Sequence, residues 1–580
     1  MGTQAQRLGS ARTLAGPPAW WQTAIRSGLT GGIVSLLVCL IGLVTTFGAR
    51  PIVGGVFSLG QTLLAGVFAF SAYRAFRATE AHAASRQTTL FAGAMAGATA
   101  GAITALLVIV GRHVINLRGM LNNASEELYN VLAFGQPTPI GVVLLIAFGL
   151  IIGLATTTIL LLAPRVRRVV IQVITWVVLL GLMADLLRVT IDQWGAISGI
   201  FAWLFSGKGL SIPGALAVAA LVVAIDFLRT KLPARPVAAQ TRVDVNRQRW
   251  IRIGVVGLVL VAMPIVLGSY FSEVFDQVGL FILMGLGLNI VVGFAGLLDL
   301  GYVAFFAIGA YVTGILTSPE LGFFNLTWWE AVPIAVAIST LIGVFLGVPV
   351  LRLRGDYLAI VTLGFGEIIR ILVLSDFLKP YIGGSQGIQQ IAKPTIGTFV
   401  FDDQQKLYYV LLAGCLLAAF VSIRLRDSRI GRAWMALRED EDVAQAMGIN
   451  LVATKLLAFA AGAAFSGLSG AIFAAKLGAA YPNSFGLLVS INVLALIIVG
   501  GMGSIPGVIV GAVVLVGLPE MLREFAEYRL MVYGAVLVAM MLYRPEGLAP
   551  EAAHRRELHE EAGPEGEPGA EVLNIPGDAR

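Results

Sequence analysis

The clearest deficit in this sequence of 580 residues is charge: Asp, Glu, Lys and Arg together make up 13% of the chain, whereas hydrophobic residues make up 57%. Soluble globular proteins carry roughly 25% charged residues, because their surface faces water. A composition this apolar excludes an ordinary soluble enzyme. It indicates a protein whose main solvent is lipid.

Residues that hold metals or form disulfides are also scarce. The two cysteines lie inside apolar stretches, and the four histidines are scattered along the chain. Structural zinc sites need closely spaced ligands, and a disulfide framework needs several cysteine pairs. The sequence therefore excludes a disulfide framework, and no metal site is expected. The residues concerned are Cys39, Cys415, His82, His113, His554 and His559.

Basic residues exceed acidic ones, and the formal net charge is +6. They form short clusters between apolar runs, a distribution that reports membrane topology and not a nucleic-acid partner. If the N-terminus is cytoplasmic, most Lys and Arg of the first part of the chain fall in cytoplasmic loops, as the positive-inside rule requires. We therefore predict cytoplasmic N- and C-termini. The exceptions are Arg50, Arg112, Arg118, Arg188 and Lys208.

Long apolar segments recur throughout the chain. A helix that crosses the hydrocarbon core needs about 20 mainly apolar residues, since unpaired backbone groups are costly in lipid. The sequence predicts an all-α, polytopic integral membrane protein with about sixteen transmembrane helices, six followed by ten. The first six are 27–48, 52–73, 88–111, 140–163, 169–187 and 212–228. The other ten are 253–271, 278–293, 301–317, 331–351, 356–375, 407–423, 453–475, 489–501, 505–519 and 529–543.

Composition changes mark the domain boundaries. Residues 229–249 are basic and contain two prolines, which is typical of a linker, here a cytoplasmic one. They divide an N-terminal membrane module, 1–228, from a second module, 250–548. Residues 549–580 are rich in Glu, Pro and Gly and poor in large apolar residues, so we expect a disordered acidic tail.

The segment 424–455 is long and charged, and it lies between two apolar spans. Small residues at helical spacing would let another protein surface approach closely. Arg438 and Asp442 would then position that surface through ion pairs. A solvated cytoplasmic loop is the alternative interpretation, and composition alone does not choose between the two.

This segment resembles the cytoplasmic coupling loop of ABC importer permeases, in which a Glu-Ala-Ala pattern is followed by Gly. Asp442, Val443, Ala444 and Gly448 stand at those positions, with Asp and Val as departures. Four other motifs are similar to the LivM-like subunits of branched-chain amino acid importers, and they occur in the expected order. They are 287–311, 351–372, 383–388 and 498–514. The resemblance covers about 253–548 and leaves the N-terminal module unrecognised.

The resemblance implies the permease subunit of an ATP-driven importer in the plasma membrane of a prokaryote. Such a subunit works by alternating access and pairs with a second homologous permease subunit. It docks two ABC ATPase subunits and receives branched-chain or related amino acids from an extracytoplasmic binding protein. Urea or amides are alternative substrates, because relatives with these motifs carry them. The implied coupling residues are Gly431, Arg432, Arg438, Glu441, Asp442, Ala444 and Gly448.

The sequence has no phosphate-binding motif of the form G-x-x-x-x-G-K-[ST]. We therefore expect that this chain is not an enzyme, that it binds no cofactor, and that its partner subunits hydrolyse ATP.

The substrate pathway is predicted from two features. Glycine clusters at 293–301 and 500–507 interrupt apolar segments, and broken helices there would expose backbone dipoles to a zwitterionic substrate. Ionisable and amide residues within spans are costly in lipid and are therefore functional candidates. The candidates are Asn289, Gly293, Gly296, Asp299, Gly301, Glu367, Arg370, Asn492, Gly500 and Gly503.

Each candidate also has a plainer interpretation. Glycines pack helices closely in membrane bundles, and Glu367 and Arg370, three residues apart, can form a structural ion pair. An ion-gradient-driven transporter would use these two residues and Asp299 as relay groups, but it leaves segment 424–455 without a role. An intramembrane enzyme fits least, since no catalytic arrangement of residues lies at membrane depth.

Overall fold

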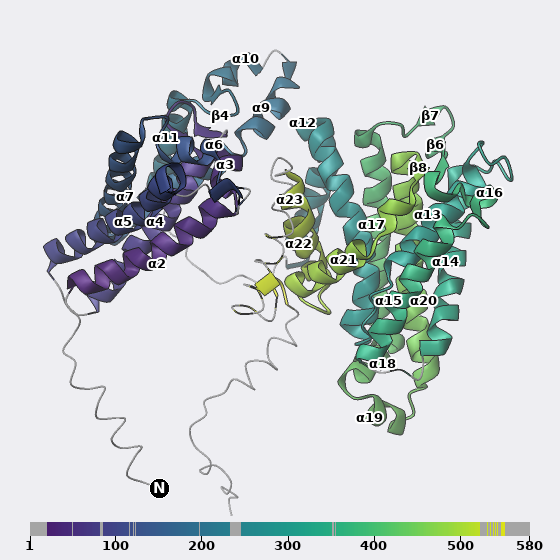
Figure 1. Ribbon diagram of the computed structural model, residues 1–580. Helices are drawn as coiled ribbons and strands as arrows, with labels where there is room; N and C mark the ends of the chain where they lie inside the picture. The colour runs from purple at the N-terminus through teal and green to yellow at the C-terminus, as the bar shows by residue number, and fades with distance from the viewer. Residues whose placement is uncertain are drawn as a thin grey trace, which may run out of the picture. The chain divides into compact units, whose positions relative to one another are not determined.

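The computed structural model describes residues 20–521, apart from 49, 82–84, 115–116, 120, 122, 196–197, 232–244, 351–352 and 354, together with scattered residues between 531 and 550. Most of the predicted linker, most of the span at 529–543 and nearly all of the tail at 549–580 lie outside the described residues. The chain forms two compact units, residues 1–243 and 244–580, each described by itself (Figure 1).

The first unit is mainly helical. Its longer helices are α2 (Trp20–Leu40), α4 (Leu59–Glu80), α5 (Arg86–Ile109), α7 (Thr138–Leu161), α8 (Pro164–Leu182) and α11 (Ile212–Lys231). Shorter helices are α3 (Leu43–Gly48), η1 (Val110–Val114), η2 (Leu117–Gly119), α6 (Glu126–Leu132), α9 (Ala184–Asp192), α10 (Ser198–Phe201) and η4 (Ala202–Leu204). Its strands are β1 (Pro51–Val53), β2 (Phe57–Ser58), β3 (Phe205–Ser206) and β4 (Gly209–Leu210), in the order β2-β1-β4-β3.

The glycines of α5 and α7 explain how these two helices pack. A Cβ atom added at Gly97 would lie 2.1 Å from the carbonyl oxygen of Gly149, and one added at Gly149 would lie 2.3 Å from that of Gly97. Gly153 meets the backbone of Gly93 in the same way. The two backbones therefore touch without intervening side chains, which is a close form of membrane helix packing.

The second unit begins with α12 (Val245–Leu288), which continues into a π-helical turn, η5 (Asn289–Phe294). The other long helices are α13 (Val303–Thr317), α14 (Trp328–Val350), α15 (Asp356–Leu374), α17 (Gln404–Arg426), α18 (Arg429–Glu439), α20 (Leu451–Leu477) and α21 (Leu487–Gly500). Shorter helices are α16 (Lys379–Ile382), η6 (Gly384–Gln386), α19 (Glu441–Ala446), η7 (Pro482–Phe485), α22 (Ile505–Ala512), η8 (Val513–Gly517) and α23 (Leu518–Met521). The strands are β5 (Ile388–Gln389), β6 (Thr395–Ile396), β7 (Phe399–Val400) and β8 (Ala479–Ala480).

Helix α20 packs closely against α13 through small residues. A Cβ at Gly470 would lie 2.1 Å from the carbonyl oxygen of Phe306, and one at Gly309 would lie 2.1 Å from that of Gly467. Beyond the C-terminal end of α20, β8 pairs with β5. Figure 1 shows α18 and α19 at one end of this unit, and α16, β6 and β7 at the other. The two groups of connections therefore lie at opposite ends of the helices.

The predicted fold class, an all-α polytopic membrane protein, is confirmed. Within the described residues, eight helices are long and apolar enough to cross a membrane, or up to ten if each of two bent pairs counts as one span. Two shorter apolar helices lie at Ile212–Leu228 and Val303–Thr317.

Among the described residues, fewer separate spans are found than the sixteen predicted. The predicted spans 253–271 and 278–293 lie in one continuous helical stretch of α12 and η5, but Gly268, with a φ of 76°, divides it into two helices, as the two predicted spans require. The spans 489–501 and 505–519 form a pair bent by 119°. Residues 51–58, at the start of the predicted span 52–73, form β1, β2 and the turn between them, so α4 begins at Leu59 and ends in a more polar sequence.

Candidate coupling and translocation site

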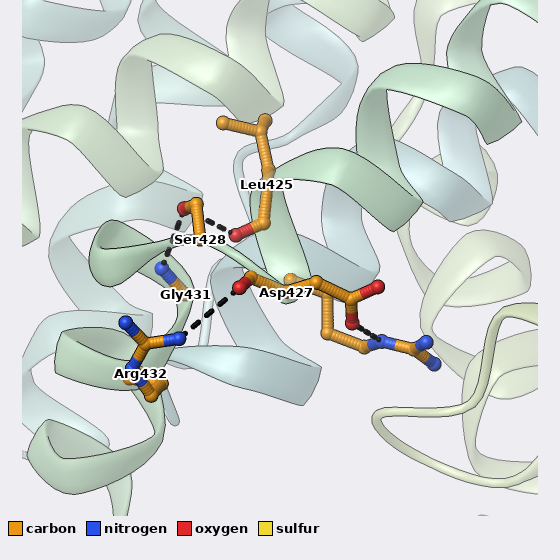
Figure 2. A network of polar contacts seen from close by, with 6 residues as sticks. Leu425, Asp427, Ser428, Gly431 and Arg432 are labelled. Atoms are coloured by element: carbon orange, nitrogen blue, oxygen red, sulfur yellow. Dashed lines mark hydrogen bonds and ion pairs between the residues drawn. The ribbon is translucent and has the colours of Figure 1, made fainter.

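The segment between α17 and α20 is folded into two capped helices. Ser428 precedes α18; its hydroxyl donates to the carbonyl oxygen of Leu425 at 2.7 Å and accepts from the amide of Gly431 at 3.2 Å. The guanidinium of Arg432 donates to the carbonyl oxygen of Asp427 at 3.1 Å. Figure 2 shows these contacts around the turn. They fix the direction in which α18 leaves α17.

Helix α18 buries one face against its own chain. Gly431 is required at the turn, because a Cβ there would lie 2.2 Å from the carbonyl oxygen of Arg426. One helical turn later Trp434 is 1% exposed, and its indole donates to the carbonyl oxygen of Thr454 at 2.9 Å. Leu437 extends the buried face by another turn. Spacing of about 3.6 residues thus leaves the opposite face, with Arg432, to solvent.

Helix α19 is anchored at its start. The carboxylate of Asp440 accepts from the amides of Asp442 and Val443 at 2.9 Å each, and Glu441 forms an ion pair with Lys455 on α20. Ala444 is 3% exposed. On the sequence interpretation, the small side chain of Ala444 faces an approaching partner; the structure shows that it makes room for packing within the chain.

Two apolar side chains, one on α19 and one directly after it, are exposed. Val443 is 58% exposed and Met447 is 80% exposed. Gly448 follows with a φ of +85°, so it ends the helix in the left-handed conformation that glycine favours. Val443 and Met447, together with three exposed charged residues of the same segment, form what we name the α18–α19 surface. The charged residues are Arg432, Glu439 and Asp442.

The first glycine joint ends η5. Asn289 is 1% exposed, and its Oδ1 accepts from the amide of Gly503 at 2.9 Å. Its Nδ2 has no hydrogen-bond partner among the described residues. Gly293 is buried, and Gly296 has a φ of +70°. The helix therefore ends here. The carbonyl oxygens of Ile290 and Val291 accept from the amides of Ala295 and Leu297, and carbonyl groups at a helix end can also accept from side chains.

The second glycine joint lies between α21 and α22. Gly501 and Gly503 have φ values of +118° and +82°, which β-carbon-bearing residues rarely adopt. Across the bend, a Cβ at Gly500 would lie 2.0 Å from the carbonyl oxygen of Gly507. The chain thus reverses sharply at a place where only glycine fits.

Arg438, in the last turn of α18, meets both joints. Its Nη1 donates to the carbonyl oxygen of Gly293 at 2.7 Å. A Cβ at Gly296 would lie 3.0 Å from the Cγ of Arg438, and a Cβ at Gly503 would lie 3.4 Å from its Nη1. The structure therefore brings together four pathway candidates and one coupling candidate. We name Arg438, Asn289, Gly293, Gly296 and Gly503 the joint cluster.

A second group connects the start of α13 to α15. The buried carboxylate of Asp299 accepts from the amide of Gly301 at 2.9 Å. The hydroxyl of Thr362 accepts from the amide of Leu300 at 3.0 Å, and a Cβ at Gly301 would lie 1.8 Å from the carbonyl oxygen of Thr362. Asp299 therefore shapes a tight backbone contact between these two helices.

Glu367 and Arg370 pair on one face of α15. The Nε of Arg370 donates to both carboxylate oxygens at 3.0 and 2.9 Å, and Nη2 also contacts Oε1. Their side chains are 44% and 37% exposed. Both carboxylate oxygens of Glu367 are thus occupied, as expected for an ion pair between residues three apart.

A cavity of about 210 Å³ lies beside this pair. Its lining is mainly apolar, with Glu367 as its charged member. The residues are Leu300, Val303, Leu363, Gly366, Glu367, Phe485 and Leu487. Ligand pockets are commonly apolar with a few polar groups, so the cavity is a candidate part of the translocation path.

One predicted pathway residue lies apart from both groups. Asn492 is partly exposed on α21, and no described hydrogen bond joins it to either group.

Three residues of the site were not among the candidates predicted from the sequence: Thr362 and the caps Ser428 and Asp440. A Ser or Asp directly before a helix is a local signal that could have revealed both caps. Thr362 gives no such signal, because its partner lies 62 residues away. No group of three His, Cys, Asp or Glu side chains suited to a metal occurs among the described residues.

The helices and their broken joints define a multi-pass membrane protein, and comparison with known proteins gives its class. Residues 270–541 match the family described as branched-chain amino acid transport system, permease component. The branched-chain amino acid permease LivM of Salmonella typhimurium LT2 is 42% identical over 316 residues, which cover 50% of this chain and 73% of the relative. LivM of Escherichia coli K12 is 42% identical over 313 residues, covering 50% and 72%.

LivH, a permease of the high-affinity branched-chain amino acid transport system of Escherichia coli K12, is 25% identical over 301 residues, covering 48% of this chain and 95% of the relative. No solved structure matches the chain. The chain belongs to the family of branched-chain amino acid transport permeases, and the similarity to LivM-like subunits predicted from the sequence is confirmed. The match leaves the first unit outside it.

Proposed function

We propose that this chain is the permease subunit of an ATP-driven importer of branched-chain or related amino acids. It would work by alternating access, together with a second homologous permease subunit and an extracytoplasmic binding protein. Two separate ABC ATPase subunits would hydrolyse ATP, so this chain would be no enzyme and would bind no cofactor. Its membrane would be the plasma membrane of a prokaryote.

The α18–α19 surface is the observation that carries this proposal. A solvated loop has no reason to hold Met447 80% exposed and Val443 58% exposed on a helix that two caps and an ion pair keep rigid. Apolar side chains with a charged rim are typical of a protein interface. The ATPase subunits are the partner that we assign to this surface, and its side of the membrane is then the cytoplasm.

The cavity supports an amino acid with an apolar side chain. Leu300, Val303 and Leu363 line it, and Phe485 and Leu487 complete its large apolar surface. Urea and small amides would gain little from such a surface, because burying apolar area favours apolar groups. Leucine should therefore compete for import much better than urea.

The energy source is tested in proteoliposomes that contain the chain with its partner subunits, with ATP inside and no ion gradient. Import that requires ATP supports the proposal. Import without ATP or the ATPases, or its abolition by Glu367→Gln alone, would favour the ion-gradient alternative. The paired geometry of Glu367 and Arg370 supports a structural role instead.

The docking surface is tested by Met447→Glu. A charge in an apolar interface should lower ATP-dependent import about tenfold, the factor that accompanies the loss of one well-placed interface contact. Because the side chain is 80% exposed, folding of the chain should not change. Met447→Leu keeps the apolar contact and serves as the control. Equal import by the two variants would contradict docking at α19.

A further inference from the structure

We infer that Arg438 is the positioning residue through which movement of the α18–α19 surface reaches the two glycine joints. The inference rests on the proposed function, because it assumes that an ATPase moves this surface. It assigns to one side chain the transmission of that movement to the helix breaks. The contacts of the joint cluster support it in three steps.

The first step is that Arg438 has two fixed ends. Its backbone belongs to α18, which is held by the cap of Ser428 and by buried Trp434. Its guanidinium donates to the carbonyl oxygen of Gly293 at 2.7 Å, at the end of η5. Hydrogen bonds of this kind have donor–acceptor distances of about 2.7–3.2 Å. A displacement of α18 therefore either moves η5 with it or breaks the bond.

The second step is that Arg438 and the first glycine joint are closely packed. A Cβ at Gly296 would lie 3.0 Å from the Cγ and 3.2 Å from the Cα of Arg438, so the backbone of the joint lies against the base of that side chain. Close-packed contacts transmit displacement because they do not compress. A shift of α18 toward the joint therefore pushes the chain at Gly296.

The third step carries the movement from one joint to the other. The Oδ1 of Asn289 accepts from the amide of Gly503 at 2.9 Å, and a Cβ at Gly293 would lie 2.7 Å from that same nitrogen. The two breaks are thus in direct contact, although 214 residues separate the hydrogen-bonded pair. Movement of η5 cannot leave the bend between α21 and α22 unchanged.

Arginine suits this role for a chemical reason. Its guanidinium stays charged and presents several donors in a rigid plane, so it can hold a backbone carbonyl while its edge lies beside Gly503. Lysine keeps a charged donor group but lacks the planar arrangement of donors. Glutamine keeps a donor but loses the charge and is too short to reach as far.

The first experiment measures amino acid molecules imported per ATP hydrolysed by the complete complex in proteoliposomes. Arg438→Gln should lower this ratio about tenfold, the factor expected for the loss of one hydrogen bond to a charged group, while ATP hydrolysis continues. Arg438→Lys should recover part of the ratio. Asn289→Leu should give the same defect, and combining it with Arg438→Gln should add little, because the two residues act in one chain of contacts.

Arg424→Gln is the matched control, since it removes the same charge at the end of the neighbouring helix α17, where Arg424 lies over the ring of Phe420. A ratio in Arg438→Gln no lower than in this control would overturn the inference. So would strict additivity of the Asn289 and Arg438 substitutions, which would show two independent defects.

The second experiment separates failure of the inference from failure of the proposed function. Amide hydrogen exchange is measured in the full chain alone, in lipid nanodiscs, for peptides covering 289–301 and 500–507. Arg438→Gln should raise exchange in both peptides, and Arg424→Gln in neither. If the wild-type complex imports nothing with ATP, the proposed function fails, yet unchanged exchange in the second peptide would still refute the mechanical connection.

Discussion

At the scale of single residues, Gly301 shows how little space the second unit leaves between backbones. A Cβ there would lie 1.8 Å from the carbonyl oxygen of Thr362, and this neighbour is main chain that cannot rotate away. A Cβ added at Gly364, on the same helix as Thr362, would meet no atom within 4 Å, and the φ of Gly364 is ordinary. Glycine is therefore required at position 301 and not at position 364, although the sequence alone does not distinguish the two.

We predict that Gly301→Ala destabilises the protein by about 3 kcal/mol, the upper end of the usual cost of overpacking. The thermal midpoint in detergent and the yield of monodisperse protein should both fall. Gly364→Ala should lower neither, because alanine favours a helix more than glycine does. Equal stability of the two variants would mean that the contact between the start of α13 and α15 is looser than described.

The ion pair on α15 permits a test by charge exchange. Glu367→Arg alone places two like charges three residues apart and should sharply reduce import, as should Arg370→Glu alone. The double exchange restores an opposite pair on the same face and should recover most of the import. Import is measured as the rate per correctly inserted subunit. If the double variant is as defective as the single variants, the carboxylate of Glu367 is needed in the translocation path for more than its pairing with Arg370.

Sequence and structure agree at this scale only where partners are near in the chain. The spacing of Glu367 and Arg370 predicted their pairing, because residues three apart on a helix are neighbours. Nothing local predicts that Arg438 reaches Gly293, since 145 residues separate them. That contact depends on the packing of α18 against the end of η5, which a pattern along the chain does not contain.

At the scale of elements, the short helices depend on their caps. Helix α18 has 11 residues and α19 has 6, so neither would be stable by itself in water. One interpretation of the sequence is a helical docking segment, and the structure divides this segment at Asp440, whose φ of −156° and ψ of 116° are extended. The division turns Val443 and Met447 outward while Trp434 stays buried.

We predict that Ser428→Ala lowers the stability of α18 by about 1 kcal/mol, the typical cost of losing an N-cap. Amide exchange in residues 429–439 should accelerate, while exchange in α20 should not. Ser428→Asp keeps an acceptor for the amides of Ile430 and Gly431 and should restore protection. Unchanged exchange in the alanine variant would show that buried Trp434 alone holds the helix.

Helix positions were the best predicted feature at this scale, since long apolar runs and spanning helices obey the same length requirement. Breaks within the runs were harder to place. Gly268 divides α12 just before the polar segment 269–277 that separates the two predicted spans, and the glycines at 54 and 55 lie in the turn between β1 and β2 instead of in a span. Glycine allows a break but does not require one, so only tertiary packing decides.

At the scale of the whole molecule, the chain consists of two units, and the family match lies within the second. Under the positive-inside rule, we predict that the basic residues of 229–249 lie on the cytoplasmic side of the first span of this unit. The apolar composition predicted the class of fold correctly, whereas the sequence contains no signal for the role of the first unit.

We predict that a truncated chain beginning at Asp244 still inserts, assembles with its partner subunits and retains part of its import activity. Co-purification with the partners and import per assembled complex measure the two properties. The full-length chain, produced in the same way, is the reference. Complete loss of assembly would show that the first unit is structurally required by the permease.

The contact between α5 and α7 has a consequence for how the first unit responds to its membrane. Where Gly97 and Gly149 touch, neither helix can slide along the other. The next equivalent glycine contact, between Gly93 and Gly153, lies four residues, about 6 Å, further along the axis. Lipid bilayers differ in thickness by only a few ångströms. The pair therefore adapts to a thinner or thicker bilayer by tilting as one rigid body, and the register of its two helices stays constant from one membrane to another.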